Sequence, residues 1–251
     1  MAQAWHLFVD AGGRSGATNM ATDQAMLDEA DRVGSSTLRL YRWDPPCLSF
    51  GRNEAATLHY DRKRIERLGI DVVRRPTGGG AVWHEQEVTY AVAAPIDGFG
   101  SLREAYCAIH ERLAVALRAL GAEVSVAPTR PPAHPPTRPG PCFNAAVGGE
   151  ILAGGRKLVG SAQVRQRKAF LQHGSILLDG SQEMIADVRR QTSDVSGSTT
   201  LSIALGRSVT FEEVSNAIVR AWGESLTSTA LDRLRPPSTA LFLDPAWTWR
   251  R

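Results

Sequence analysis

The sequence predicts one α+β domain over residues 1–251, in which a mixed, largely antiparallel sheet is flanked by helices. A chain of this length suits one large domain, and no internal repeat and no linker divides it. Short apolar segments typical of strands lie before and after helical segments, without the regular strand–helix alternation of a parallel sheet. With 43% apolar and 22% charged residues, the composition is that of a globular protein with a full core.

Apolar spacing and turn residues predict the elements of the first half. Apolar residues at helical spacing predict a helix over 19–33, with Thr18 or Asn19 as its N-cap. The polar stretch DRKRIERL predicts a surface helix over 61–68. Strands are predicted at 5–9, 38–42, 47–50 and 71–75. The stretch AGGRSGA after the first strand is predicted to be a loop, and the strand at 38–42 to be half-buried.

The second half is predicted in the same way. An amphipathic helix is expected over 102–120 and another over 211–226, while 192–206, rich in Ser and Thr, is expected to be irregular. Strands are predicted at 88–94 and 124–126. Between 151 and 178 we expect antiparallel strands, the first two joined by a hairpin about Gly154 and Gly155. The two tryptophans near the end of the chain are expected to pack on the domain.

A proline-rich segment, PTRPPAHPPTRPGP, interrupts these elements at 128–141. Half of the 14 prolines of the chain fall in it, so neither a regular helix nor a sheet strand is expected there. Long loops in compact domains are usually lids or disordered insertions, and we expect a flexible loop. The loop ends directly at Cys142.

Composition narrows the location and the class of partner. No apolar run approaches the ~20 residues of a membrane span, and the first residues, MAQAWHLFVD, have neither a basic leader nor an apolar core of a signal peptide. A cytoplasmic protein without membrane contact is expected. The net charge is +3 and the pI is near 9.0, but basic and acidic residues are interspersed. An acidic protein partner fits this charge as well as RNA does.

The three cysteines are too far apart for a metal-binding or redox pair. Cys47, Cys107 and Cys142 form no CxxC motif, and in a reducing compartment disulfides and zinc are not expected. No metal site is therefore predicted. Cys47 falls inside a strand and Cys107 inside a helix, so both are expected to be structural.

The stretch RRPTGGGAVWH combines charged groups with bare backbone. It contains Arg74, Arg75, the glycines Gly78, Gly79 and Gly80, and His84. Glycine permits positive φ and lets a ligand approach the main chain closely. A hairpin turn and a ligand-binding loop explain this stretch equally well.

Two further motifs point to acyl chemistry. GRKLVGSAQ places Lys157 shortly before Gly160, Ser161 and Ala162, and LQHGS contains His173. Main-chain N–H groups and an ammonium can neutralise the oxygen charge of a carboxyl or acyl group without bulk. From composition alone, however, Lys157 would be a surface lysine and His173 a core histidine.

In this order and spacing, RRPTGGGAVWHEQEVTYAV, GRKLVGSAQ and LQHGSILLD resemble the biotin/lipoate protein ligase family, specifically its lipoate ligases and octanoyltransferases. The resemblance extends to the helix NMATDQAML and to the terminal WTWRR. It implies the single-domain fold of that family with a mixed sheet. It also implies attachment of octanoyl or lipoyl groups to a target lysine on lipoyl domains of 2-oxoacid dehydrogenases or on the glycine cleavage H protein.

The resemblance favours a cysteine-type octanoyltransferase over a ligase. Such enzymes take octanoate from acyl carrier protein through an enzyme thioester and need no cofactor, whereas the ligases activate free lipoate with ATP and Mg²⁺. Their nucleophilic cysteine lies in a Cys-Phe pair before the lysine of the GRK motif, as Cys142 does before Lys157 here. Two departures favour the ligase instead: residues 146–149 lack the Pro-Ser-x-Tyr of the transferases, and GRNE at 51–54 with the intact GGGAV is ligase-like.

The resemblance assigns provisional roles to these residues. Cys142 is expected to be the nucleophile, with Lys157 as the cation that favours its thiolate. The glycine motifs are expected to bind substrate with Arg74, Arg75, His84 and His173, and their N–H groups to stabilise the oxyanion. A noncatalytic acyl-binding or nucleic-acid-binding module with the same fold is the alternative of another class.

Overall fold

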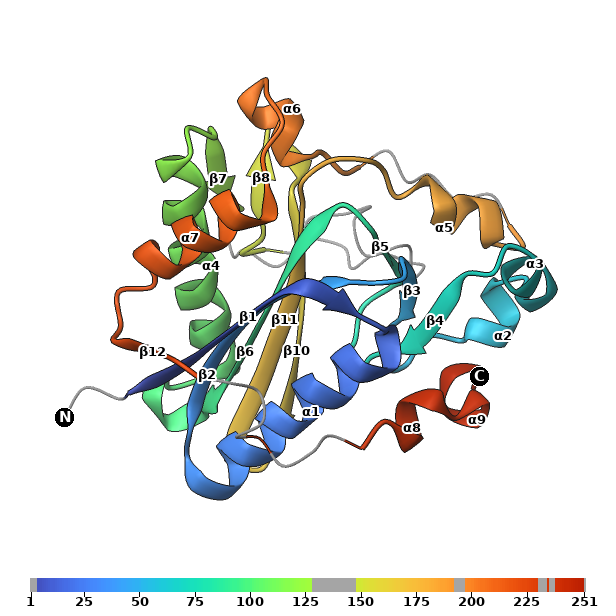
Figure 1. Cartoon of the computed structure of the whole chain (residues 1–251), viewed down its shortest axis with the longest axis horizontal. Helices are drawn as coiled ribbons and strands as arrows, with labels where there is room; N and C mark the ends of the chain where they lie inside the picture. Colours follow the sequence, from blue (N-terminus) through green and yellow to red (C-terminus); the bar gives the residue numbers. More distant parts are fainter. Residues whose placement is uncertain (1–3, 128–147, 192–196, 230–233, 235–237, 251) are drawn as a thin grey trace.

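A mixed six-stranded sheet forms the centre of the molecule (Figure 1). The computed structural model describes residues 4–127, 148–191, 197–229, 234 and 238–250. The strand order is β10-β11-β6-β2-β1-β12. The strands are β1 Trp5–Arg14, β2 Ser36–Trp43, β6 Glu87–Pro95, β10 Val159–Gln166, β11 Ala169–Leu177 and β12 Leu226–Ser228. The pairs β10–β11, β11–β6 and β2–β6 are antiparallel, whereas β1 is parallel to both β2 and β12, so the predicted fold class is confirmed.

Two small sheets flank the large one. One has the order β4-β3-β5, from Asp71–Arg74, Cys47–Phe50 and Val82–His84, and the other the order β7-β8-β9, from Val124–Val126, Ile151–Ala153 and Arg156–Lys157. The hairpin about Gly154 and Gly155 is confirmed, and both glycines have positive φ, 55° and 75°. The strand that follows is not continuous as predicted: it breaks at Leu158, so β9 and β10 belong to different sheets.

Helices cover both faces of the large sheet. Helix α1, Gly16–Val33, packs Met20, Met26 and Leu27 against Ala91 and Leu171 of one face. Helices α4, Leu102–Ala119, and α7, Phe211–Ala221, lie against each other and cover the other face. Their amphipathic spacing is the reason that these helices were predictable.

Short helices lie around the small sheets and near the end of the described chain. They are α2 Ala56–His59, α3 Arg62–Arg67, η1 Ile96–Gly98, α5 Glu183–Val188, α6 Leu201–Leu205, α8 Ala240–Leu243 and α9 Pro245–Thr248. Trp249 packs in a cluster with Phe50 and Tyr60, which confirms that the terminal tryptophans pack on the domain. No helix in the described ranges is long and apolar enough to cross a membrane.

Several predicted boundaries were wrong. The first strand continues through the expected loop to Arg14, and α1 is capped by Ser15, whose hydroxyl accepts from the Thr18 N–H. Strand β2 is buried on both faces except at Arg42, because helices cover both sides of the sheet. The short helices α5 and α6 were missed, and α7 ends at Ala221 because Leu226 joins the sheet. The proline-rich loop predicted at 128–141 lies outside the described residues.

Candidate active site

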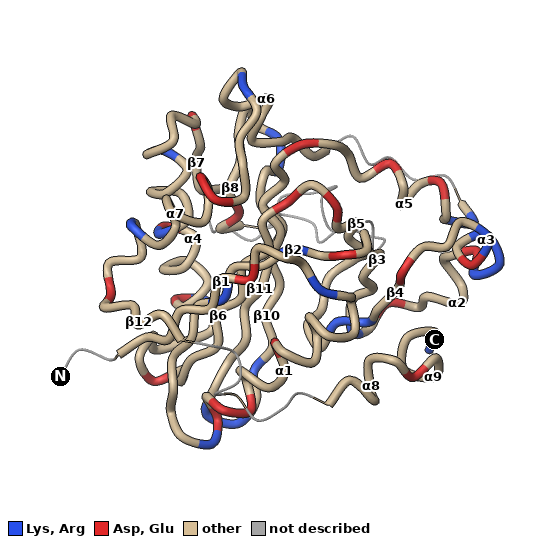
Figure 2. The backbone as a smooth tube through the Cα atoms, viewed as in Figure 1, with Lys and Arg blue, Asp and Glu red and all other residues tan. Residues whose placement is uncertain are grey.

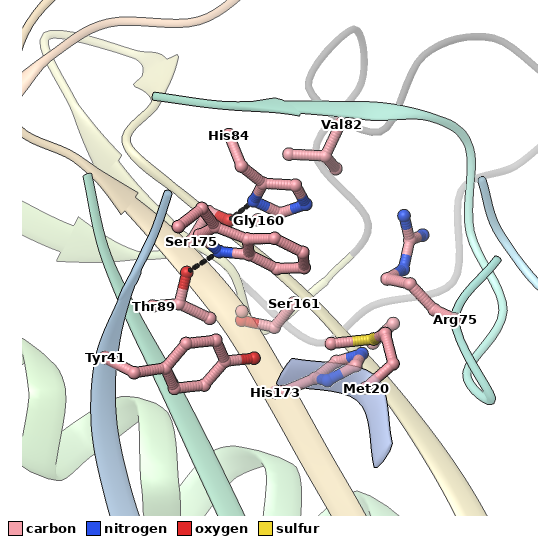
Figure 3. A pocket seen from close by; sticks show the side chains of 13 residues that line it. Met20, Tyr41, Arg75, Val82, His84, Thr89, Gly160, Ser161, His173 and Ser175 are labelled. Carbon is pink, nitrogen blue, oxygen red and sulfur yellow. Dashed lines mark hydrogen bonds between the residues drawn. The ribbon is translucent and has the colours of Figure 1, made fainter. Parts of the chain in front are cut away.

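A small pocket lies on the α1 face of the large sheet, where the β4-β3-β5 sheet meets it (Figure 3). Six residues predicted to bind substrate line it: Arg75, His84, Gly160, Ser161, Ala162 and His173. The lining also includes residues that the sequence analysis did not single out, namely Met20, Tyr41, Trp43, Val82, Thr89, Gly174 and Ser175. Apolar and polar side chains alternate around this space, so it suits a ligand with an apolar body and a polar end.

The buried carboxylate of Asp23 organises the floor of the pocket. It accepts hydrogen bonds from Arg39 Nη1 at 2.9 Å, Tyr41 OH at 2.8 Å and His173 Nδ1 at 2.8 Å. Burial alone raises the pKa of Asp23, but the His173 hydrogen bond and the Arg39 charge outweigh burial and leave this pKa below its ordinary value. Asp23 is therefore ionised and paired, as a buried charge must be.

His173 joins this floor to the glycine loop. Burial lowers its pKa despite the contact with Asp23, so the imidazole is neutral at pH 7. Because Asp23 accepts at Nδ1, the proton lies there and Nε2 accepts from the Thr77 hydroxyl at 2.6 Å. Thr77 directly precedes Gly78, so the loop is held on the pocket floor.

Arg75 and His84 form the opposite wall. Arg75 Nη1 donates to Ser49 Oγ at 2.7 Å, and this hydroxyl lies 2.6 Å from His84 Nε2. His84 stacks on Trp43 with ring centroids 4.0 Å apart and contacts Glu87 Oε1 through Nδ1 at 2.8 Å. Arg75 and His84 are thus held rigidly at the pocket, which suits groups that orient a substrate.

The glycine loop is not a hairpin turn. Strands β4 and β5 pair with opposite edges of β3, so the loop between them crosses the end of that sheet. Arg75 Nη2 donates to the carbonyls of Gly78 and Gly80, both at 2.9 Å. A Cβ atom at Gly51 would lie 1.8 Å from the Gly79 carbonyl oxygen, so the loop packs on bare backbone. The three loop glycines are not among the residues that line the pocket.

Arg74 points away from the pocket, contrary to its predicted role. Its guanidinium is fully buried and donates to main-chain carbonyls of two segments. The acceptors, at 2.6–3.2 Å, are Gly51, Arg52, Glu54, Trp247, Thr248 and Arg250. Arg74 therefore joins the turn after β3 to the residues of α9, and a structural role replaces the expected contact with substrate.

Lys157 is buried, with 3% of its surface exposed, and its Nζ contacts Glu150 Oε1. It lies in β9, three residues before Gly160, and is not among the residues that line the pocket. The expectation of a solvated lysine from composition is wrong for this residue. Cys142 lies outside the described residues. Cys47 is buried in β3, and burial followed by the Asp71 charge raises the pKa of its thiol, as expected of a structural cysteine.

A second buried polar cluster lies on the α4 face of the sheet, behind Ser161. His110 of α4 contacts the Gly149 carbonyl through Nδ1 at 2.5 Å and Ser161 Oγ through Nε2 at 2.9 Å. Tyr90 OH lies 2.7 Å from the same Ser161 oxygen. Neither His110 nor Tyr90 was singled out from the sequence; the signal was a histidine beside Ile109 on the apolar face of a predicted helix.

The buried imidazole of His110 predicts a loss of stability in mild acid. Burial, opposed by the Gly149 hydrogen bond and assisted by the Lys157 charge, lowers its pKa from 6.5 to about 4. Between these values the unfolded chain binds more protons than the folded one, so the free energy of unfolding falls as the pH falls, by about 3 kcal/mol in all. Asp23, whose pKa lies below 3.8, loses its contribution only at lower pH.

Urea unfolding at pH 7, 5 and 4 measures this loss. The His110→Asn variant lacks the titrating ring and is expected to lose less stability over the same range, whereas His173 is buried and titrates in the same direction in both proteins. Equal losses in the two proteins would contradict the prediction.

The described residues hold no group of three His, Cys, Asp or Glu side chains able to bind a metal ion. Described groups that can take part in acyl chemistry include the Lys157–Glu150 pair, the side chains that line the pocket and the main chain of β10. Strand β10 is the last strand of its sheet among the described residues. Its N–H groups on the side away from β11 are therefore candidates for binding an acyl oxygen.

The sequence and the fold match one class of protein, the lipoyl protein ligase A/B catalytic domains. Residues 15–223 match the lipoyl protein ligase A/B catalytic domain, and the chain belongs to this family. Two relatives are named octanoyltransferase LipM. The protein from Moorella thermoacetica is 43% identical over 182 residues, 70% of this chain and 66% of that protein; the one from Kyrpidia tusciae is 39% identical over 243 residues, 89% and 88% of the two chains.

Solved structures match the fold. A putative lipoate protein ligase from T. acidophilum, Ta0514 with bound lipoic acid, has a TM-score of 0.77 at 20% identity, covering 99% of both chains. A lipoate-protein ligase A bound with ATP has a TM-score of 0.71 at 24% identity, covering 91% of this chain and 88% of that one. These likenesses confirm the expected biotin/lipoate ligase-like fold.

Proposed function

We propose that this chain is a protein octanoyltransferase, which moves an octanoyl group from acyl carrier protein to the target lysine of a lipoyl domain or of H protein. One observation carries the proposal: relatives named octanoyltransferase are 31–43% identical to this chain, and one from Geobacillus kaustophilus matches 99% of it. The two ligase structures described above are 24% and 20% identical to this chain and support the fold alone. An ATP-dependent lipoate ligase is accordingly the less favoured activity.

The proposed reaction has two steps. The thiolate of Cys142 attacks the octanoyl thioester, a new carbon–sulfur bond forms, and the carrier thiol leaves with a proton. The neutral amine of the target lysine then attacks the acyl-enzyme, the amide bond forms, the amine proton is released, and the Cys142 thiolate is regenerated. Neither step requires ATP or a metal ion.

The described residues are proposed to assist both steps. Lys157, paired with Glu150, supplies the positive charge that favours a thiolate and a developing oxyanion. The pocket holds the octanoyl chain against Met20, Trp43 and Val82. Main-chain N–H groups of residues 160–162, which line the pocket, bind the oxyanion, each worth on the order of 3 kcal/mol when well placed.

Intact-mass analysis tests this proposal. After incubation with octanoyl-acyl carrier protein, the wild-type protein is expected to gain the mass of one octanoyl group, and the Cys142→Ala variant to gain none. The Cys47→Ala and Cys107→Ala variants are matched controls that should still be acylated. Pyrophosphate exchange with lipoate and ATP provides the opposing assay: exchange that survives Cys142→Ala, without an acyl adduct, would identify a ligase.

Acidic partners are expected to meet one of two basic surfaces. Basic residues gather along helix α3 in the coloured backbone (Figure 2). Those exposed there are Arg62, Lys63, Arg64 and Arg67, and those exposed at the β10–β11 turn are Arg165, Arg167 and Lys168. Charges of this kind steer association and lose their effect with salt. Reversal of two charges on the surface that meets the donor is expected to lower kcat/KM by about tenfold at low salt.

The variants Lys63→Glu/Arg67→Glu and Arg165→Glu/Lys168→Glu test the two surfaces separately. Arg220→Glu, on the exposed side of α7, is the control. The loss should shrink as salt rises from 50 to about 500 mM, because the Debye length falls several-fold. A transfer rate without salt dependence would exclude electrostatic steering.

A further inference from the structure

A line of buried and partly buried hydrogen bonds crosses the α4 face of the sheet and ends at the Gly149 carbonyl. On β10 and β11, Gln163 Nε2 donates to Gln172 Oε1 at 2.8 Å, and Gln172 Nε2 donates to Tyr90 OH at 2.8 Å. Tyr90 OH then contacts Ser161 Oγ, and Ser161 Oγ contacts His110. The line therefore connects the pocket strand to α4.

The acceptor at the end of the line fixes the tautomer of His110. The Gly149 carbonyl can only accept, so His110 Nδ1 carries the hydrogen, and the neutral ring accepts at Nε2. Ser161 Oγ at 2.9 Å and Tyr90 OH at 3.2 Å are both within reach of Nε2 as donors, and Gln172 donates to Tyr90. All members are satisfied in one arrangement, which makes a buried polar network rigid.

The same line lies beside the charged pair of the proposed active site. Gly149 directly precedes Glu150, whose carboxylate contacts the Lys157 ammonium. Burial is the main cause of the lowered pKa of His110 and of the raised pKa of Tyr90; the Lys157 charge adds to the first shift and the Glu150 charge to the second. The Glu150–Lys157 pair is therefore close enough to the hydrogen-bonded line to interact with it electrostatically.

We propose that His110 is a positioning residue for acyl transfer: by joining the Gly149 carbonyl to Ser161 of the pocket wall, it holds the Glu150–Lys157 pair in place relative to the pocket. The role assigned to Lys157 rests on the function proposed above. A Cβ atom at Gly174 would lie 2.4 Å from Ser161 Oγ and 2.9 Å from Tyr90 Cε1. The line therefore also requires a residue without a side chain at this position of β11.

Two amide substitutions separate the contacts of His110. Asparagine places an amide N–H near the position of Nδ1 and can keep the bond to Gly149, whereas glutamine reaches the position of Nε2 and can keep only the bond to Ser161. Phenylalanine removes both. If the hydrogen bond to Gly149 positions the pair, His110→Asn should keep the Lys157 reactivity and the transfer rate of the wild type. His110→Gln should then match His110→Phe in both measurements.

Competitive acetylation of lysines measures how accessible the Lys157 ammonium of the Glu150–Lys157 pair is. The chain has three lysines, and Lys63 and Lys168 are exposed, so they serve as internal standards for the buried Lys157. With acetic anhydride and mass spectrometry, His110→Gln and His110→Phe are expected to raise the labelling of Lys157 by about tenfold, as loss of a buried hydrogen bond favours local opening. The kcat of transfer should fall by about tenfold or more with KM for the donor unchanged, because a small misplacement is costly in rate.

Unchanged Lys157 labelling in folded His110→Phe, or equal labelling in His110→Asn and His110→Gln, would overturn the inference. If His110→Phe does not fold, the comparison of Lys157 labelling in His110→Asn and His110→Gln still tests the inference. The labelling needs no octanoyl donor, so it separates the two proposals. A wild type that forms no octanoyl adduct contradicts the proposed function alone, and unchanged labelling in variants of an active enzyme contradicts this inference alone.

Discussion

Replacing Lys157 by methionine is expected to lower the rate of octanoyl transfer by about two to three orders of magnitude, the loss typical of removing one group that stabilises an oxyanion. The same change leaves the Glu150 carboxylate buried, with 2% of its residue surface exposed, and without its ammonium partner. Breaking a buried pair in this way costs about 3–5 kcal/mol. Lower activity therefore has to be separated from lower stability.

The double variant Lys157→Met/Glu150→Gln makes this separation. It removes both charges, so much of the stability should return in urea unfolding, while the rate of transfer should stay as low as in the single variant. Steady-state kinetics with octanoyl-acyl carrier protein provides the rate. Recovery of activity along with stability would show that Lys157 is structural and would remove it from the proposed chemistry.

Replacing Arg74 by methionine is expected to destabilise the protein by about 4 kcal/mol, since it leaves several buried carbonyls without a donor. These carbonyls belong to the turn at 51–54 and to residues 247–250, which the guanidinium joins. Lysine at this position retains the charge but lacks the planar fork of donors, so Arg74→Lys should recover only part of the loss. Urea unfolding measures both variants.

Two other arginines serve as controls for Arg74. Arg64→Met, on the exposed side of α3, should change the free energy of unfolding by less than about 0.5 kcal/mol. Arg75→Met should lower transfer activity, because Arg75 lines the pocket and holds the glycine loop. A stable Arg74→Met protein with impaired substrate binding would restore the role that the sequence predicted for Arg74.

The long helices and the strands of the large sheet other than β12 were predictable because their patterns are local, whereas β12 falls where the predicted helix was extended to 226. Periodic apolar residues defined α4, and positive-φ glycines defined the β8–β9 hairpin. The order of strands was not predictable: the placement of β3 between β4 and β5 depends on tertiary pairing, and only this placement excludes a hairpin at the glycine loop.

The site residues that were missed are polar groups whose partners are distant in the chain. Asp23 lies within an apolar helix pattern, and its partners Arg39 and His173 are 16 and 150 residues away. A motif identifies groups that are neighbours in sequence, such as Arg75 and Gly78, but not pairs of this kind. The available signal was an acidic residue, Asp23, at the helical spacing of the apolar residues Met20 and Leu27. Arg39 gave no such signal, because it lies opposite Leu38 and Leu40 on a strand that was predicted to be half-buried.

The contacts of Arg74 also have a consequence for folding during synthesis. Its hydrogen bonds to the carbonyls of Trp247, Thr248 and Arg250 span 173 to 176 residues. A nascent chain makes the β4-β3-β5 sheet early, yet the guanidinium beneath it gains these acceptors only after residues 247–250 have emerged from the ribosome. Contacts of such high sequence separation form slowly, so the turn at 51–54 is joined to residues 247–250 late in translation or after it.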